Sequence, residues 1–149
     1  METPGAPTDL SAISIDLDLH VPYAAAVEQV RVALRDQGFG VLTEIDVQAT
    51  FKEKLGVDFR PYVILGACNP VLAHEALSAD LAIGLLLPCN VVVYETEPGR
   101  SRVQIMDPVA ALALEQSEQI TPIAHEARGR LEKAADTLRQ ADELAREAV

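Results

Sequence analysis

The feature that most constrains the fold is a near-continuous apolar run from Pro61 to Ala67. A strand made only of apolar residues is typical of the interior of a sheet whose two faces are both covered. The run is followed by Asn69, a good helix N-cap, and by Pro70, which suits a first helical turn. The sequence therefore predicts a central strand that leads into a short helix with Leu72 and Ala76 on its inner face.

Strand and helix patterns alternate before this run. In residues 13–19, Ile and Leu alternate with Ser and Asp, which is the period of a half-buried strand. Apolar residues at helical spacing follow over residues 22–38, and residues 39–45 predict a second strand. Asp46 can cap a short helix that ends at Gly56.

The pattern after the central helix is less regular. Leu81 to Leu87 is apolar and ends at a proline, which predicts an irregular buried connection or a short strand. Residues 91–95 and 102–106 predict two further strands. The dipeptide Pro98-Gly99 between them is typical of a type II turn, because only its second position needs a positive φ.

The clearest helix lies at about residues 121–147, where Thr121 can cap the helix and Pro122 can open it. Its narrow apolar stripe suits packing on the sheet or on a partner chain. The order β-α-β-α-β-α-(β)-β-β-α predicts a single α+β domain, residues 12–149, with a mixed β-sheet and helices mostly on one face. Residues 1–11 predict a flexible N-terminal tail.

Composition limits the partners. The 149 residues carry a formal net charge of −11, and this field repels nucleic-acid backbones and anionic membrane surfaces. The most apolar window, Leu81 to Tyr94, is too short to span a bilayer. The start of the sequence lacks the basic and apolar regions of a signal peptide. Two cysteines without an export signal favour reduced thiols and a cytoplasmic location.

The two cysteines lie in short proline-containing turns, Cys-Asn-Pro at residues 68–70 and Pro-Cys-Asn at residues 88–90. If residues 61–67 and 91–95 are neighbouring strands, both Cys-Asn pairs would form a small polar pocket in an apolar frame. Alternatively, the thiols are buried structural groups and the asparagines satisfy backbone groups of the turns. The spacing leaves both interpretations open.

No dinucleotide, P-loop, nucleophile-elbow or Cys-x-x-Cys signature occurs in the sequence, which predicts no catalytic residue and favours a non-enzymatic role. An alternative is a thiol-based redox, sulfur-handling or soft-metal-binding protein. A helix N-terminus beside Cys68 would favour its thiolate, with Cys89 as resolving thiol or second ligand. Copper(I) suits two thiolates, whereas zinc would need more ligands, such as His74.

Two carboxylates, Glu44 and Asp46, lie close together at the end of the second predicted strand, and on a strand they would share a face. Because Asp46 is expected to cap a helix, a catalytic pair is not favoured.

Three motifs together resemble the domain of unknown function 302 family: Glu44-Ile45-Asp46, Gly66 through Pro70, and Gly84 through Asn90. The resemblance runs from about Ile13 to the end of the chain. It implies a small α+β domain of bacteria and archaea, in members that form homodimers, and it implies no agreed enzymatic activity.

With the acidic composition, these observations predict a homodimeric binding or accessory domain for a small ligand or a protein partner. They predict no cofactor, with copper or zinc as the metals to consider. The candidate binding residues are Cys68, Asn69, Cys89, Asn90 and Glu44.

Overall fold

The fold is built on one five-stranded sheet. The structure is a computed structural model that describes residues 10–115 and 117–148. Within these ranges the strand order is β1-β5-β4-β3-β2, and all neighbouring strands are antiparallel. The strands are β1 (Ser14–Leu19), β2 (Gly40–Asp46), β3 (Tyr62–Cys68), β4 (Cys89–Glu97) and β5 (Arg100–Met106).

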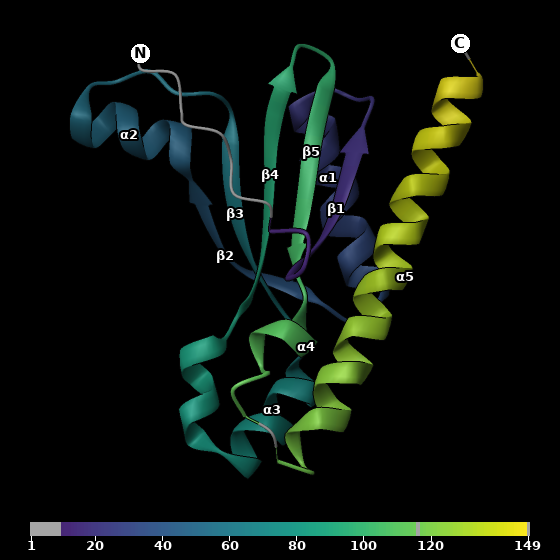
Figure 1. The fold of residues 1–149 in the computed structure, drawn as a ribbon. Coiled ribbons are helices and arrows are strands. Elements are labelled where there is room, and N and C mark those ends of the chain that lie inside the picture. Colours follow the sequence, from purple (N-terminus) through teal and green to yellow (C-terminus); the bar gives the residue numbers. More distant parts are fainter. Residues whose placement is uncertain (1–9, 116, 149) are drawn as a thin grey trace.

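The helices surround this sheet unevenly. They are α1 (Tyr23–Asp36), α2 (Val47–Leu55), α3 (Pro70–Ala79), the 3-10 helix η1 (Leu81–Leu86), α4 (Pro108–Ala111) and α5 (Ile120–Glu147). Figure 1 shows α1 behind the sheet, α5 along the side of β1, and α3 and α4 together below the lower end of the strands. None of the helices in the described ranges is long and apolar enough to cross a membrane.

The α+β class is confirmed, but the prediction of a mixed sheet is wrong. Helix α1 carries the chain from one edge of the sheet to the other, so β1 and β2 never become neighbours. Each later strand then returns beside the strand before it, in the opposite direction. The predicted tail, residues 1–11, lies outside the described residues except for its last two positions.

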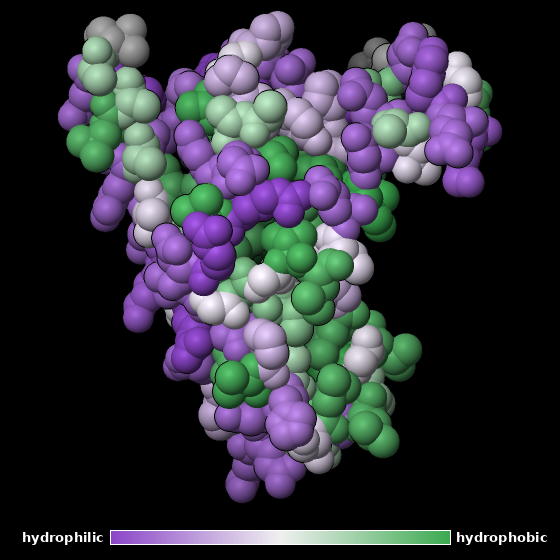
Figure 2. Space-filling view, turned by 180° about the vertical axis from the view of Figure 1, so that it is seen from behind, coloured by the Kyte–Doolittle hydropathy of each residue, from purple (hydrophilic) through white to green (hydrophobic). Residues whose placement is uncertain are grey.

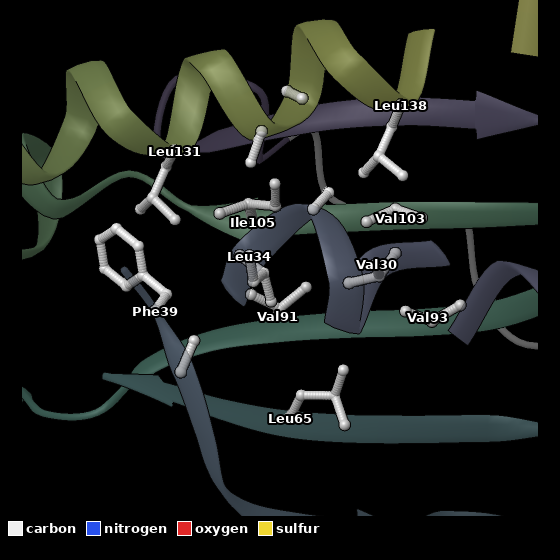
Figure 3. Close-up of a cluster of buried hydrophobic side chains, with 14 of the residues drawn as sticks. Val30, Leu34, Phe39, Leu65, Val91, Val93, Val103, Ile105, Leu131 and Leu138 are labelled. Carbon is white, nitrogen blue, oxygen red and sulfur yellow. The ribbon is translucent and has the colours of Figure 1, made fainter. Parts of the chain in front are cut away.

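The core lies between one face of the sheet and the helices α1 and α5. It is almost purely aliphatic, as a chain with few aromatic residues requires (Figure 3). Each fully buried Val, Leu or Ile side chain contributes about 1.5–3 kcal/mol of transfer free energy. The sheet supplies Leu17, Leu19, Val63, Leu65, Val91, Val93, Val103 and Ile105, and the helices supply Val30, Leu34, Leu131 and Leu138.

Strand β3 lies in the interior of the sheet, between β2 and β4, as predicted. Only one of its faces is fully covered, however, because Tyr62 and Ile64 on the other face are half-buried. The continuous apolar run therefore indicated the interior position correctly and overstated the burial of the second face.

The apolar segment after α3 is helix η1 and not a strand. The side chain of Asp80 accepts a hydrogen bond from the backbone N–H of Ala82 at 2.9 Å, which starts a helical turn. Ile83 is buried, but Leu81 and Leu85 are 85% and 89% exposed, so most of the predicted burial of this segment is wrong. Figure 2 shows apolar surface over this part of the molecule, at the lower right.

Several predicted caps are confirmed. The Asp46 carboxylate accepts from the N–H of Ala49 at 2.9 Å, and Gly56 ends α2 with a φ of 67°. Gly99 has a φ of 81°, as a type II turn requires. Thr121, in contrast, does not cap α5: the helix begins one residue earlier, and the Thr121 hydroxyl donates to a backbone oxygen in the preceding turn.

A buried carboxylate ties α5 to the sheet. Asp142 accepts hydrogen bonds from the backbone N–H of His20 at 2.6 Å and from its ring Nδ1 at 3.0 Å. The other ring nitrogen, Nε2, lies 2.8 Å from a guanidinium nitrogen of Arg100. Because a guanidinium only donates, Nε2 accepts and the ring proton lies on Nδ1, facing Asp142. This cluster joins α5, the end of β1 and the β4–β5 hairpin.

We expect Asp142→Ala to lower the free energy of unfolding by about 1–3 kcal/mol, since it leaves the N–H of His20 without its acceptor. Asp142→Asn should cost less, because its amide oxygen can still accept that N–H. Urea unfolding measures both changes, with Glu143→Ala, an exposed neighbour, as the control. Equal stability of the Asp142 and Glu143 variants would show that the cluster does not hold α5.

Candidate functional site

A cavity of about 50 Å³ lies where β3 and β4 end and α3, α4 and α5 come together. The strand ends contribute Ala67, Cys68 and Cys89, and the helices contribute mainly alanine and leucine. Phe39, just before β2, closes one side, and Figure 3 shows it at one end of the core cluster. The cavity is therefore an extension of the core beyond the ends of β3 and β4.

The register of β3 and β4 brings the two cysteines to this place. Ala67 pairs with Cys89, so Cys68, the last residue of β3, lies one position beyond the first residue of β4. A cis peptide bond between Leu87 and Pro88 precedes Cys89. The two strands are neighbours, as the pocket hypothesis required. Binding of a ligand by these cysteines stays a prediction.

Burial keeps both thiols protonated. The pKa of Cys89 is raised to about 11, mainly by burial and in smaller part by Cys68 and the carboxylate of Asp107. Burial also raises the pKa of Cys68. The helix N-terminus after Cys68 was expected to lower its pKa, but the shift is upward and its cause is burial of the thiol. Neutral thiols at neutral pH are poor nucleophiles.

The asparagines have different positions. Asn69 is buried and lines the cavity, and its Oδ1 accepts from the N–H of Leu72 at 3.1 Å, so it caps α3 as predicted. Asn90 is exposed and pairs with Gly66, outside the cavity wall. The wall is almost wholly apolar. The polar pocket expected from the two Cys-Asn pairs is therefore replaced by an apolar cavity with a few polar groups at its edge.

Glu44 lies on the edge strand β2, away from the cavity, and pairs with Arg31 of α1 at 2.5 Å. Asp46 is engaged as the cap of α2. The pKa of Tyr23 is raised to about 12, mainly by burial and in smaller part by the charges of Asp46 and Glu44. Glu44 and Asp46 thus place two negative charges close to Tyr23 of α1.

His74 is exposed on α3 and lines a separate shallow depression with Glu75 and Ser78. His74 therefore does not line the cavity with Cys68 and Cys89. Within the described ranges, no three or more His, Cys, Asp or Glu side chains form a group that could hold a metal ion.

Sequence reasoning missed the role of Gly66. A Cβ at this position would lie 2.1 Å from Oγ1 of Thr43 and 2.8 Å from Cγ of Pro88. The missing side chain therefore lets β2 and the proline turn close over β3. A glycine inside an apolar strand is the available signal, because it often marks a close approach of another chain segment. The small residues of α5 that line the cavity, Ala124 and Ala127, carry no comparable signal.

We expect Gly66→Ala to lower the free energy of unfolding by about 1–3 kcal/mol, because the new methyl group overpacks the site. Adding Thr43→Ala should restore part of this loss by removing the nearest atom. The control is Gly40→Ala, whose Cβ would meet no described atom within 4 Å. Chemical denaturation of the four proteins measures the effect. A fully neutral Gly66→Ala would contradict the close approach.

We also expect both cysteines to react slowly with iodoacetamide at neutral pH, because a raised pKa lowers the thiolate fraction. The rate at Cys89 should keep rising with pH up to about 11, whereas an unfolded control should level off near the ordinary thiol pKa. Mass spectrometry of each alkylated peptide gives the two rates. Rapid labelling of native Cys68 at neutral pH would refute the protonated state.

Comparisons with known proteins agree with this architecture. A search of the curated proteins gives no match. The crystal structure of an uncharacterized conserved DUF302 protein from Bacillus stearothermophilus is similar, with a TM-score of 0.74 and 31% sequence identity. The similarity covers 83% of this chain and 96% of that one. The family described as Domain of unknown function DUF302 matches residues 15–138. This match contains all three motifs that suggested the resemblance, and the chain belongs to the DUF302 family.

Proposed function

We propose that the chain is a small homodimeric binding or accessory module, and that the cavity at the ends of β3 and β4 takes its ligand. The observation that carries the proposal is the convergence of two distant turns on one preformed cavity, with Cys68, Asn69 and Cys89 all on its wall. Concave, mostly apolar sites with a few convergent polar groups are the usual place for small ligands.

Binding fits the surrounding groups better than catalysis does. The thiols are protonated because burial raises the pKa of each. The nearby carboxylate of Asp107 caps α4 through the N–H of Val109 at 2.8 Å and lies 3.5 Å from Nε of Arg128. Asp107 is thus engaged in structural contacts and the thiols are protonated, so none of these groups is placed as a nucleophile or proton carrier. The thiol-based alternative receives no comparable support.

The proposed ligand contacts come from the cavity wall. Cys68 and Cys89 would offer polarisable sulfur atoms, and Asn69 would offer its amide group. Asn90 and Glu44 lie outside this wall, so we assign them to contacts made beyond the cavity, by a larger ligand or a partner.

The edge strand β2 is the better candidate for the dimer interface. Two surfaces are candidates, an exposed sheet edge and the C-terminal helix. The apolar stripe of α5 is buried against its own sheet, for example at Leu131 and Leu138. Strand β2 instead exposes Leu42 (68%) and Ile45 (50%) at an edge that can pair with another strand.

Sedimentation tests the dimer. We expect the native chain to sediment as a dimer and Ile45→Lys as a monomer, because a lysine would bring its charge into the interface. Leu144→Lys, which changes an exposed leucine on α5, should leave the dimer intact. A monomeric native chain would overturn the homodimer. Dissociation by Leu144→Lys alone would move the interface to α5.

A mixed fragment library tests the ligand site. Amide chemical shifts should change around residues 67–69 and 87–89 when a fragment binds. Ala124→Leu, which fills the cavity from α5, should abolish these changes, and Ala141→Leu, an exposed change on the same helix, should keep them. If the fragment-induced shifts persist in Ala124→Leu, the cavity is excluded as the binding site.

A further inference from the structure

We propose that the group bound in the cavity is an uncharged alkyl group at the end of a larger molecule. The ligand class is then a short-chain aliphatic compound whose polar part stays in solvent. This inference rests on the proposed function, since it names the ligand of the same cavity.

The wall is made by small apolar side chains. Five of the residues that line the cavity are alanines, namely Ala67, Ala73, Ala76, Ala124 and Ala127. They leave the space open, and larger apolar groups such as Phe39, Leu72 and Leu87 complete it. Such a wall gains free energy from apolar surface that leaves water. It gives no compensation to a charged group for the loss of its hydration.

The polar groups at the edge are also uncharged. The two thiols are protonated at neutral pH because burial raises their pKa values. The Oδ1 of Asn69 is already engaged by the N–H of Leu72. Among the described residues, no Lys, Arg, Asp or Glu lines the cavity. The carboxylate of Asp107, whose charge raises the pKa of Cys89, would repel an anion.

The size sets an upper limit on the buried group. The volume of about 50 Å³ is a third of the roughly 150 Å³ of a cavity that holds benzene. It is also far below the roughly 300–1,000 Å³ of sites for drug-sized ligands. Only a short alkyl group fits, so the rest of the molecule lies outside. Pro88, which lines the cavity and is exposed, marks the side that opens to solvent.

Water is a poor occupant of this space. A buried water needs two to four polar partners to be well held, and the wall offers few. Replacing a poorly held water by an apolar group increases affinity. An alkyl group therefore competes well for the cavity.

The cavity also lies between two separately packed clusters. Leu72 and Ala127 belong to the main core, whereas Ala76 and Ala124 belong to a smaller cluster under η1 and α4. The bound alkyl group would therefore contact side chains of both clusters.

The experiment uses the full native chain and three matched series of probes. Straight-chain primary alcohols are compared with carboxylates and with amines of the same chain length, by titration of the amide shifts. We expect the alcohols to bind at the cavity, with affinity rising about fourfold for each added methylene until the space is full. The charged analogues should bind about tenfold more weakly or worse, because the wall cannot replace their hydration.

Filled-cavity variants locate the effect. Ala124→Leu and, as a second variant at a half-buried position of α3, Ala73→Leu should each remove alcohol binding. Ala141→Leu should not, and thermal unfolding checks that every variant is folded. Carboxylates or amines that bind the cavity as tightly as alcohols would overturn the alkyl assignment and leave the proposed site intact. If no probe of any series shifts the cavity residues, both the alkyl assignment and the proposed site fail.

Discussion

Burial of one sheet face under α1 and α5 is the interaction on which the rest of the structure depends. Without this cover, the inner row of Val, Leu and Ile side chains on the sheet would stay in water. The helices are stabilised by the sheet in turn, because the apolar stripe of α5 is buried against it. The cluster around Asp142 fixes how far along the sheet α5 lies. That position in turn brings the first half of α5 over the strand ends, where Ala124 and Ala127 face the cavity.

The cavity is a consequence of how the sheet ends. Strand β3 passes directly into α3 at the Asn69 cap, and β4 begins directly after Pro88. Helix α3 therefore follows the sheet, and η1 precedes it, at the same end of these two strands. Side chains from α3, α4 and α5 must then fill a space that no strand occupies. The small residues there do not fill it. Gly66, which has no side chain, lets both Pro88 and Thr43 of β2 lie close to β3 at this end of the sheet.

Local sequence patterns predicted strands and helix starts well, but they predicted the strand order and the packing of side chains poorly. Alternation gave β1, and the capping residues Asp46 and Asn69 marked two helix starts, because both signals act within a few residues. The antiparallel order was missed because sequence shows that α1 connects two strands but not how far apart they lie. Helix η1 was missed because a short apolar run suits a strand or a helix equally. Cys68, Asn69 and Cys89 were predicted to lie at one pocket, but the alanines of the cavity wall were missed because alanines are common in any helix.

The pKa of the cysteines illustrates the same limit and carries a functional consequence. From sequence alone, the helix N-terminus beside Cys68 was the visible influence, and it argued for a thiolate. Desolvation is set by packing, which sequence does not display, and it raises the pKa of both thiols. The burial that disfavours thiolate chemistry is also what makes the wall suitable for an alkyl group. Burial of Cys68 and Cys89 in an apolar wall therefore disfavours a reactive thiol and favours an apolar ligand at the same time.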